Sequence, residues 1–161
     1  MQGAAILSAD GLYRYSLTRV WNPSLSILPW TLLNPSKADA HIVDPTVKRC
    51  VAYSLGFGFG GMELTNLYAF RTTVPGELGW TNDPIGPENQ AHLVRISKSP
   101  QIVVAWGALD ACGFYGARER ADYVLDLYRM AGAKLWCIGK TAYGFPRHPC
   151  RAPHIARPVA Y

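Results

Sequence analysis

The sequence is poor in charged residues and has no long apolar run, and each lack excludes a class of protein. Charged residues make up 17% and hydrophobic residues 49%, a balance that excludes a disordered chain. The longest apolar stretch, Ile27 to Leu33, is interrupted by Pro29 and Thr31 and is far shorter than the roughly 20 residues of a membrane-spanning helix. The first residues lack the basic start of a secretory signal. We therefore expect a folded, cytoplasmic protein with no membrane partner.

Cysteine is scarce and scattered. Cys50, Cys112, Cys137 and Cys150 form no Cys-x-x-Cys pair and no cluster with histidine at zinc-ligand spacing. We expect free, mostly buried thiols, no metal and no other cofactor. The alternative is an iron–sulfur site that all four cysteines form after folding. Their wide separation in sequence argues against it, because the cysteine ligands of such sites usually lie close together in the chain.

The chain has 161 residues, so we expect one domain, 1–161, acting as a monomer. Its 16 Lys and Arg against 11 Asp and Glu give a formal charge of +5. This excess suits a polyanionic partner such as a nucleic acid, although dispersed basic residues also serve solubility.

Glycine and proline divide the chain into strand-like and helix-like segments in alternation. A half-exposed strand over Leu12–Val20 comes first, and the segment 140–161 is expected to be a proline-rich surface loop. Buried strands are expected over Ile27–Leu33, Met62–Tyr68, Gln101–Trp106 and Lys134–Ile138, and helices over Pro45–Gly56, Pro87–Lys98 and Gly116–Ala131. The alternation predicts a three-layer α/β fold: a four-stranded parallel central sheet with helices on both faces, plus an N-terminal strand.

Ligands of open parallel sheets bind beyond the carboxyl ends of the strands, where this chain places polar and aromatic residues. These residues are Asn34 and Ser36, then Asn66, then Trp106, then Lys140 and Thr141, which lead to His148. The amides of Asn34 and Asn66 each offer a donor and an acceptor, which suits a base edge or a water. Turn geometry explains Asn34 equally well because Pro35 follows it. His148 is either a solvated loop residue or a donor to a developing anion.

Charged and aromatic residues near these loops complete the candidate site. Asp39 has no evident structural task and is the candidate general base, although loop carboxylates are commonly just solvated, whereas Asp44 is expected to cap its helix. Tyr68 and Trp106 could stack on a base or belong to the core. Arg71 is expected to bind substrate, and the residues expected on the DNA backbone are Lys37, Arg49, Arg147 and Arg151.

Two apparent nucleotide-binding motifs fail on context. The glycines of residues 56–61 fit G-x-G-x-x-G but follow a helix and precede a strand, the reverse of the dinucleotide arrangement. Gly139-Lys140-Thr141 ends like a phosphate-binding loop, but Lys134 occupies the position of the required upstream glycine. Neither predicts a nucleotide loop, although Lys140 could contact a phosphate.

Six ordered motifs between about Tyr13 and Pro153 resemble the bacterial and phage family of unknown function numbered 1643. They are Asn34–Asp39, Asp44–Cys50, Asn66–Arg71, Asp83–Asn89, Ala105–Gly107 and Pro146–Pro149.

The order of motifs is also similar to that of the uracil-DNA glycosylase superfamily. This resemblance implies a four-stranded parallel sheet in which Asn34 positions the attacking water, Asn66 reads the edge of a flipped base and His148 stabilises the departing base anion. Ser36 and Cys150 depart from that pattern, standing where relatives have Gly and Ser. An unusual or hypermodified base would fit these changes.

The resemblance therefore implies a hydrolase of the DNA glycosylase type, which cleaves the N-glycosidic bond of a modified or damaged base. It also implies DNA rather than RNA as the nucleic-acid partner. The alternatives are a non-catalytic module that binds nucleic acid or nucleotides, and a hydrolase of free modified nucleotides.

Overall fold

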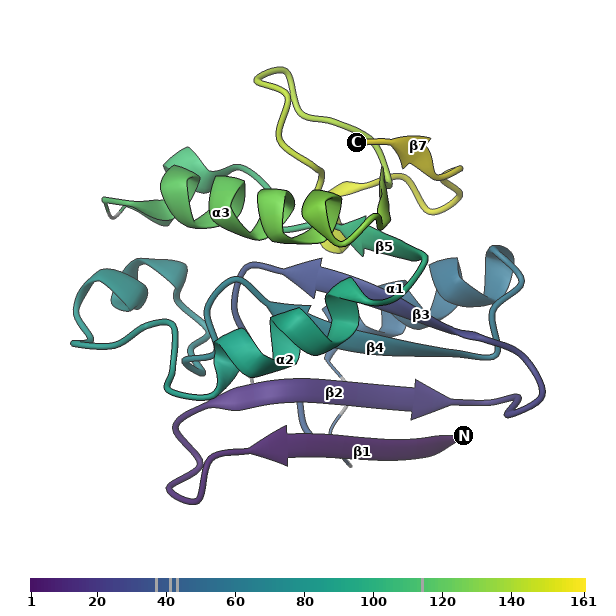
Figure 1. The fold of residues 1–161 in the computed structure, drawn as a ribbon, viewed down its shortest axis with the longest axis horizontal. Coiled ribbons are helices and arrows are strands. Elements are labelled where there is room, and N and C mark those ends of the chain that lie inside the picture. Colours follow the sequence, from purple (N-terminus) through teal and green to yellow (C-terminus); the bar gives the residue numbers. More distant parts are fainter. Residues whose placement is uncertain (37, 41, 43, 114) are drawn as a thin grey trace.

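The protein is a three-layer α/β structure built on one seven-stranded sheet (Figure 1). The computed structural model describes residues 1–36, 38–40, 42, 44–113 and 115–161, the side chains of residues 111 and 112 excepted. The strands lie side by side in the order β1-β2-β4-β3-β5-β6-β7. Their bounds are β1 Gln2–Leu7, β2 Arg14–Val20, β3 Ile27–Leu32, β4 Gly61–Asn66, β5 Gln101–Val104, β6 Lys134–Cys137 and β7 Val159–Ala160.

The predicted α/β class is confirmed, but the sheet is mixed. The four central strands β4, β3, β5 and β6 run parallel to one another. The pairs β1–β2 and β2–β4 at one edge and the pair β6–β7 at the other are antiparallel. The prediction of a single additional strand was therefore incomplete. The prediction that 140–161 is irregular was also wrong in part, because β7 pairs with β6. β7 forms by pairing with β6, which lies well before it in the chain, and local sequence does not reveal such pairing.

All three expected helices are present, with bounds close to those predicted. They are α1 Pro45–Gly56, α2 Asn89–Ser97 and α3 Ala117–Met130. Three short 3₁₀ helices lie in the connecting segments: η1 Pro75–Gly79, η2 Leu109–Cys112 and η3 Pro149–Arg151. The predicted cap of α1 is confirmed, because the Asp44 carboxylate accepts a hydrogen bond of 2.8 Å from the Val47 N–H. None of the helices in the described residues has the length and apolarity that crossing a bilayer requires.

The helices cover opposite faces of the sheet, as the alternation along β5 demonstrates. Ile102 and Val104 belong to a core cluster with residues of α2 and α3, and Val103 between them belongs to a second cluster with residues of α1. Successive strand residues point to opposite faces. The sheet is therefore sandwiched between α1 on one side and α2 with α3 on the other.

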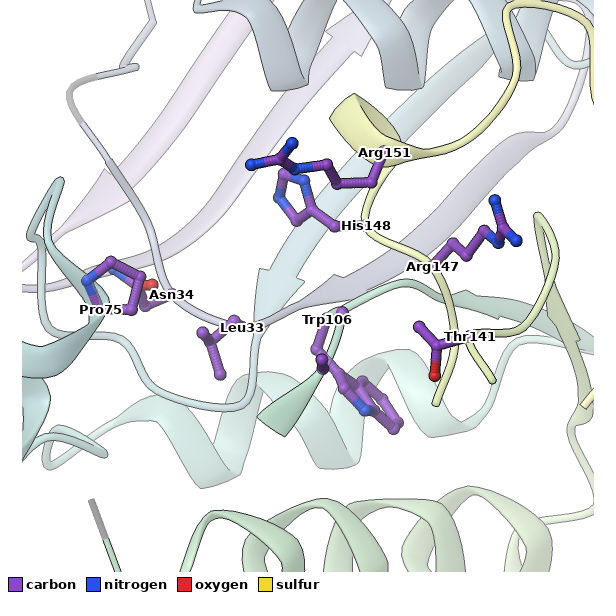
Figure 2. A pocket seen from close by; sticks show the side chains of 10 residues that line it. Leu33, Asn34, Pro75, Trp106, Thr141, Arg147, His148 and Arg151 are labelled. Atoms are coloured by element: carbon purple, nitrogen blue, oxygen red, sulfur yellow. The ribbon is translucent and has the colours of Figure 1, made fainter. Parts of the chain in front are cut away.

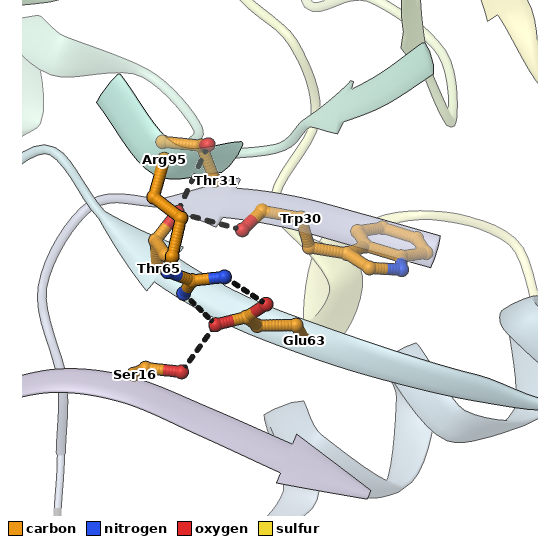
Figure 3. A network of polar contacts seen from close by, with 6 residues as sticks. All are labelled: Ser16, Trp30, Thr31, Glu63, Thr65 and Arg95. Carbon is orange, nitrogen blue, oxygen red and sulfur yellow. Dashed lines mark hydrogen bonds and ion pairs between the residues drawn. The ribbon is translucent and has the colours of Figure 1, made fainter. Parts of the chain in front are cut away.

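Polar contacts, of which those of Thr31 and Thr65 are buried, tie the central strands to their neighbours (Figure 3). Thr65 of β4 donates to the Trp30 carbonyl of β3 at 3.1 Å, and Thr31 shares a hydrogen bond of 2.7 Å with the Tyr128 hydroxyl of α3. Glu63 of β4 accepts from Ser16 of β2 and pairs with Arg95 of α2. Buried polar groups need such partners, so these contacts fix the register that places the loop after β3.

Candidate active-site cleft

Two adjoining cavities lie at the carboxyl ends of the parallel strands. The first, of about 390 Å³, is lined by Trp106 among others and is called here the Trp106 cavity (Figure 2). The second, of about 280 Å³, is lined by Arg14 and is called the Arg14 cavity. Asn34, Pro75 and His148 line both cavities. The two cavities therefore form one cleft, with Asn34 and His148 at their junction.

Asn34 lies just beyond β3, and its amide has a fixed orientation. The Nδ2 group donates to the Thr72 carbonyl at 2.8 Å and to the Pro35 carbonyl at 3.2 Å. Both amide hydrogens are thereby used. The Oδ1 atom is left as the group of Asn34 that a water or a ligand in the cleft can use, and it can only accept.

His148 presents the complementary group. It caps η3, and its Nδ1 accepts a hydrogen bond of 3.3 Å from the Cys150 N–H. In the neutral ring the proton therefore lies on Nε2. Burial lowers the pKa of His148 below its ordinary value of 6.5; the Asp44 carboxylate opposes this and Arg151 adds to it. At neutral pH the ring is an uncharged donor through Nε2–H.

Trp106 and Gly107 follow β5 and form a wall beside His148. The indole is buried, packs edge-on against Tyr161 at 6.1 Å between centroids, and contributes surface to the Trp106 cavity. Gly107 has φ +84°, and a Cβ built on it would lie 3.2 Å from the Cβ of His148. This close approach and the positive φ both require glycine. Trp106 belongs to the core, as one of its two interpretations predicted, and also lines the cavity; its stacking on a base stays a prediction.

Besides His148, the last predicted segment contributes three of its four other expected residues to the cleft. Thr141, Arg147 and Arg151 line the Trp106 cavity. Arg147 is held by a hydrogen bond of 3.0 Å from its Nε to the Lys140 carbonyl. The Lys140 side chain itself lines neither cavity, and its Nζ lies 5.1 Å from the centroid of the Tyr161 ring.

Two charged residues, Asp44 and Arg14, line the Arg14 cavity, and the sequence analysis did not predict Arg14 as a site residue. Ser36 and Asp44 line it, and Ser36 donates to the Asp44 carboxylate at 3.1 Å. Asp44 therefore lines the cavity in addition to capping α1, the role that was predicted for it. Arg14 of β2 is 3% exposed, and the strand pattern around it gave no sign that it would reach a site.

Besides Lys140, four more of the residues predicted to act on the substrate lie outside the cleft. Asn66 is fully buried and lines neither cavity, and its amide has no hydrogen-bond partner among the described residues. Tyr68 belongs to the core cluster of α2 and α3. Arg71 donates to the Gly11 carbonyl at 3.1 Å and lines a separate cavity. Asp39 accepts from the Ile42 N–H at 2.8 Å, so it has the structural task that sequence reasoning did not find.

Arg49, predicted to contact the DNA backbone, makes several contacts within the protein. Its Nε donates to the Pro149 carbonyl at 3.1 Å, another nitrogen donates to the Ala152 carbonyl, and the guanidinium lies 5.6 Å from the centre of the Tyr53 ring. Arg49 thereby fastens the segment after His148 to α1. Lys37, also predicted to contact DNA, lies outside the described residues.

Cys50, Cys137 and Cys150 are free thiols, as predicted. The described residues bring no three His, Cys, Asp or Glu side chains together in a way that could hold a metal ion.

Comparison with known proteins identifies the family. No curated protein and no solved structure matches the chain. The sequence profile of the family described as "Protein of unknown function (DUF1643)" matches residues 14–150. This span covers most of the sequence, so the chain belongs to that family.

Proposed function

We propose that this protein hydrolyses an N-glycosidic bond and releases a modified or damaged base from DNA. The observation that carries the proposal is the pair Asn34 and His148 at the junction of the two cavities. One presents a fixed acceptor and the other an uncharged donor. Hydrolysis of this bond needs an acceptor for the attacking water and a donor for the base that leaves as an anion.

The remaining residues of the cleft suit the other parts of such a substrate. Leu33 and Trp106 offer apolar surface to a flat base in the Trp106 cavity, and the exposed guanidinium groups of Arg147 and Arg151 suit phosphates. The Asp44 carboxylate, in the adjoining cavity, favours the positive charge that develops on the sugar. Asp44 would thus be the carboxylate of the site, in an electrostatic role, in place of Asp39, which the sequence suggested as the general base.

The fold supports the same proposal. We interpret the parallel strands β4-β3-β5-β6 as the counterpart of the four-stranded sheet of the uracil-DNA glycosylase superfamily, with β1, β2 and β7 added at its edges. Asn34, Trp106 and His148 would then occupy the positions that the motif order implies. Asn66 would not read the base, because it lines neither cavity.

The test is base release from oligonucleotides carrying uracil, deaminated purines or hypermodified pyrimidines, detected by alkaline cleavage of abasic sites. We expect Asn34→Ala and His148→Asn to reduce release by roughly 10²–10³-fold, the usual effect of losing one oriented donor or acceptor. Asparagine at position 148 can still cap η3, so its effect reports the loss of Nε2–H.

The matched control is His154→Ala, because His154 is exposed and lines neither cavity. We expect it to retain activity. Full activity in both cleft variants would exclude the proposed mechanism. Firm binding of every oligonucleotide without release of any base would favour the non-catalytic module.

A further inference from the structure

Arg14 is a buried cation with unused hydrogen-bonding capacity. The side chain is 3% exposed, and its one hydrogen bond among the described residues runs from Nη1 to the Ala38 carbonyl at 2.8 Å. Its Nε is buried without a partner. Burial lowers the pKa of Arg14 to about 10, so it is charged at neutral pH. The Asp44 carboxylate favours the charge of Arg14, but no hydrogen bond joins the two side chains among the described residues. Leaving a charged N–H donor buried without a hydrogen-bond partner is costly, which points to a partner that is not part of the chain.

A β-bulge aims Arg14 at the cavity. Ile6 of β1 pairs with Ser16 of β2 and Leu7 pairs with Arg14, so Tyr15 is an extra residue in β2. Tyr15 stacks on His92 of α2 at 5.3 Å between centroids, and Ser16 also faces α2 through Glu63. Strict alternation would have placed Arg14 on the same face as Ser16. The bulge turns Arg14 to the α1 face, as bulges beside functional sites do.

The rest of the Arg14 cavity suits a terminal acceptor group. Leu32, Val47 and Leu64 line it and are almost completely buried, so its inner end lies inside the protein. Thr46 lines it from the first turn of α1, where the helix dipole favours negative charge. Both oxygens of Asp44, which also lines it, already accept hydrogen bonds. A continuous nucleic-acid strand could not pass through such a cavity, whereas the end of a substituent could enter it.

We propose that the Arg14 cavity binds an oxyanion of the substrate, a carboxylate or a terminal phosphate, through the guanidinium of Arg14, whose Nε–H has no partner among the described residues. The inference rests on the proposed function, because it places this anion on the molecule whose glycosidic bond lies between Asn34 and His148. A carboxylate would be a substituent of a modified base. A terminal phosphate would belong to a free nucleotide.

The test is calorimetric titration with deoxyuridine, deoxyuridine monophosphate and deoxyuridine that carries a carboxylate on its pyrimidine ring. We expect one of the two charged ligands to bind at least about tenfold more tightly than deoxyuridine, the usual gain from hydrogen bonds to a charged group. The ligand that gains identifies the source of the anion. Arg14→Gln should abolish the gain.

Arg19→Gln is the matched control. Arg19 lies in the same strand and is also 3% exposed, but its guanidinium donates to the carbonyls of Thr18, Asp39 and Ile42, and it lines neither cavity of the cleft. The Arg19→Gln variant should still bind the charged ligand more tightly than deoxyuridine. Thr73→Phe is a second variant that fills the cavity from its exposed rim and leaves the core intact, so it decides the matter if Arg14→Gln does not fold.

Equal affinity for charged and uncharged ligands, or no binding of any of them, would overturn the inference. Survival of the preference in Arg14→Gln or Thr73→Phe would do the same. An anion preference without base release counts against the proposed function alone. Release of an uncharged base by a protein with no anion preference counts against this inference alone.

Discussion

The backbone of Gly107 packs against the side chain of His148. A Cβ on Gly107 would lie 3.2 Å from the Cβ of His148, and the Gly107 N–H donates to the Pro146 carbonyl at 2.9 Å. The end of β5 therefore supports the loop that carries His148 into the cleft. A change at Gly107 should act on the geometry of the cleft as well as on stability.

We predict that Gly107→Ala is more harmful than Gly132→Ala. Both glycines have nearly the same positive φ, +84° and +83°, but a Cβ at Gly132 would meet nothing within 4 Å. The strained backbone should cost each variant about 1 kcal/mol. Gly107→Ala should lose further stability and most base release, because His148 must move. Thermal unfolding and the oligonucleotide assay measure the two effects; identical behaviour of the variants would contradict the prediction.

We predict that His148 titrates below 6.5, its ordinary pKa, because burial disfavours the charged ring. Below pH 6.5 the folded state therefore binds fewer protons at His148 than the unfolded state does. The stability that the uncharged ring contributes is fully present above pH 6.5 and is lost as the pH falls below that value. Arg151→Gln should raise the pKa of His148, since Arg151 lowers it.

Residue-specific NMR titration of the His148 ring measures this pKa directly, and specificity is needed because burial also lowers the pKa of His92. Arg157→Gln, at an exposed position in the C-terminal segment, is the control. A His148 pKa above 6.5 in the unaltered protein would refute the assignment of an uncharged donor.

We predict that Arg49 and Arg147 differ in their effect on nucleic-acid binding. If Arg147 contacts a phosphate, Arg147→Gln should reduce the slope of log affinity against log salt by about 1. Arg49→Gln should leave the slope unchanged and lower the free energy of unfolding by about 1–3 kcal/mol, because it frees the carbonyls of Pro149 and Ala152. Salt titrations and denaturant unfolding decide this. A reduced slope in Arg49→Gln would restore the original prediction of a DNA contact.

We predict that Tyr128→Phe destabilises the protein by about 1–2 kcal/mol without affecting base release, since it removes the buried hydrogen bond to Thr31. Tyr123→Phe is the control, because Tyr123 lies on the same helix and is exposed. Denaturant unfolding should separate the two. Equal stability of both variants would show that the Thr31 contact contributes nothing.

Much of the fold was predictable because its signals are local. The Asp44-Pro45 pair marks the start of α1, and apolar spacing marks the three helices and the parallel strands. Three of the proposed cleft residues were predictable for a related reason: the carboxyl ends of parallel strands share one edge of a sheet, so Asn34, Trp106 and His148 had to approach one another once the topology was right.

The sequence by itself determined the helices, the parallel strands and the edge at which the cleft forms. Only the tertiary structure decided which side chains reach that cleft. The bulge at Tyr15 turns the Arg14 side chain toward the cleft, whereas Asn66 is buried away from it. Arg49 binds the Pro149 carbonyl of the C-terminal segment instead of lining the cleft. The direction of a strand side chain depends on register, and register is set by pairing between residues far apart in the chain.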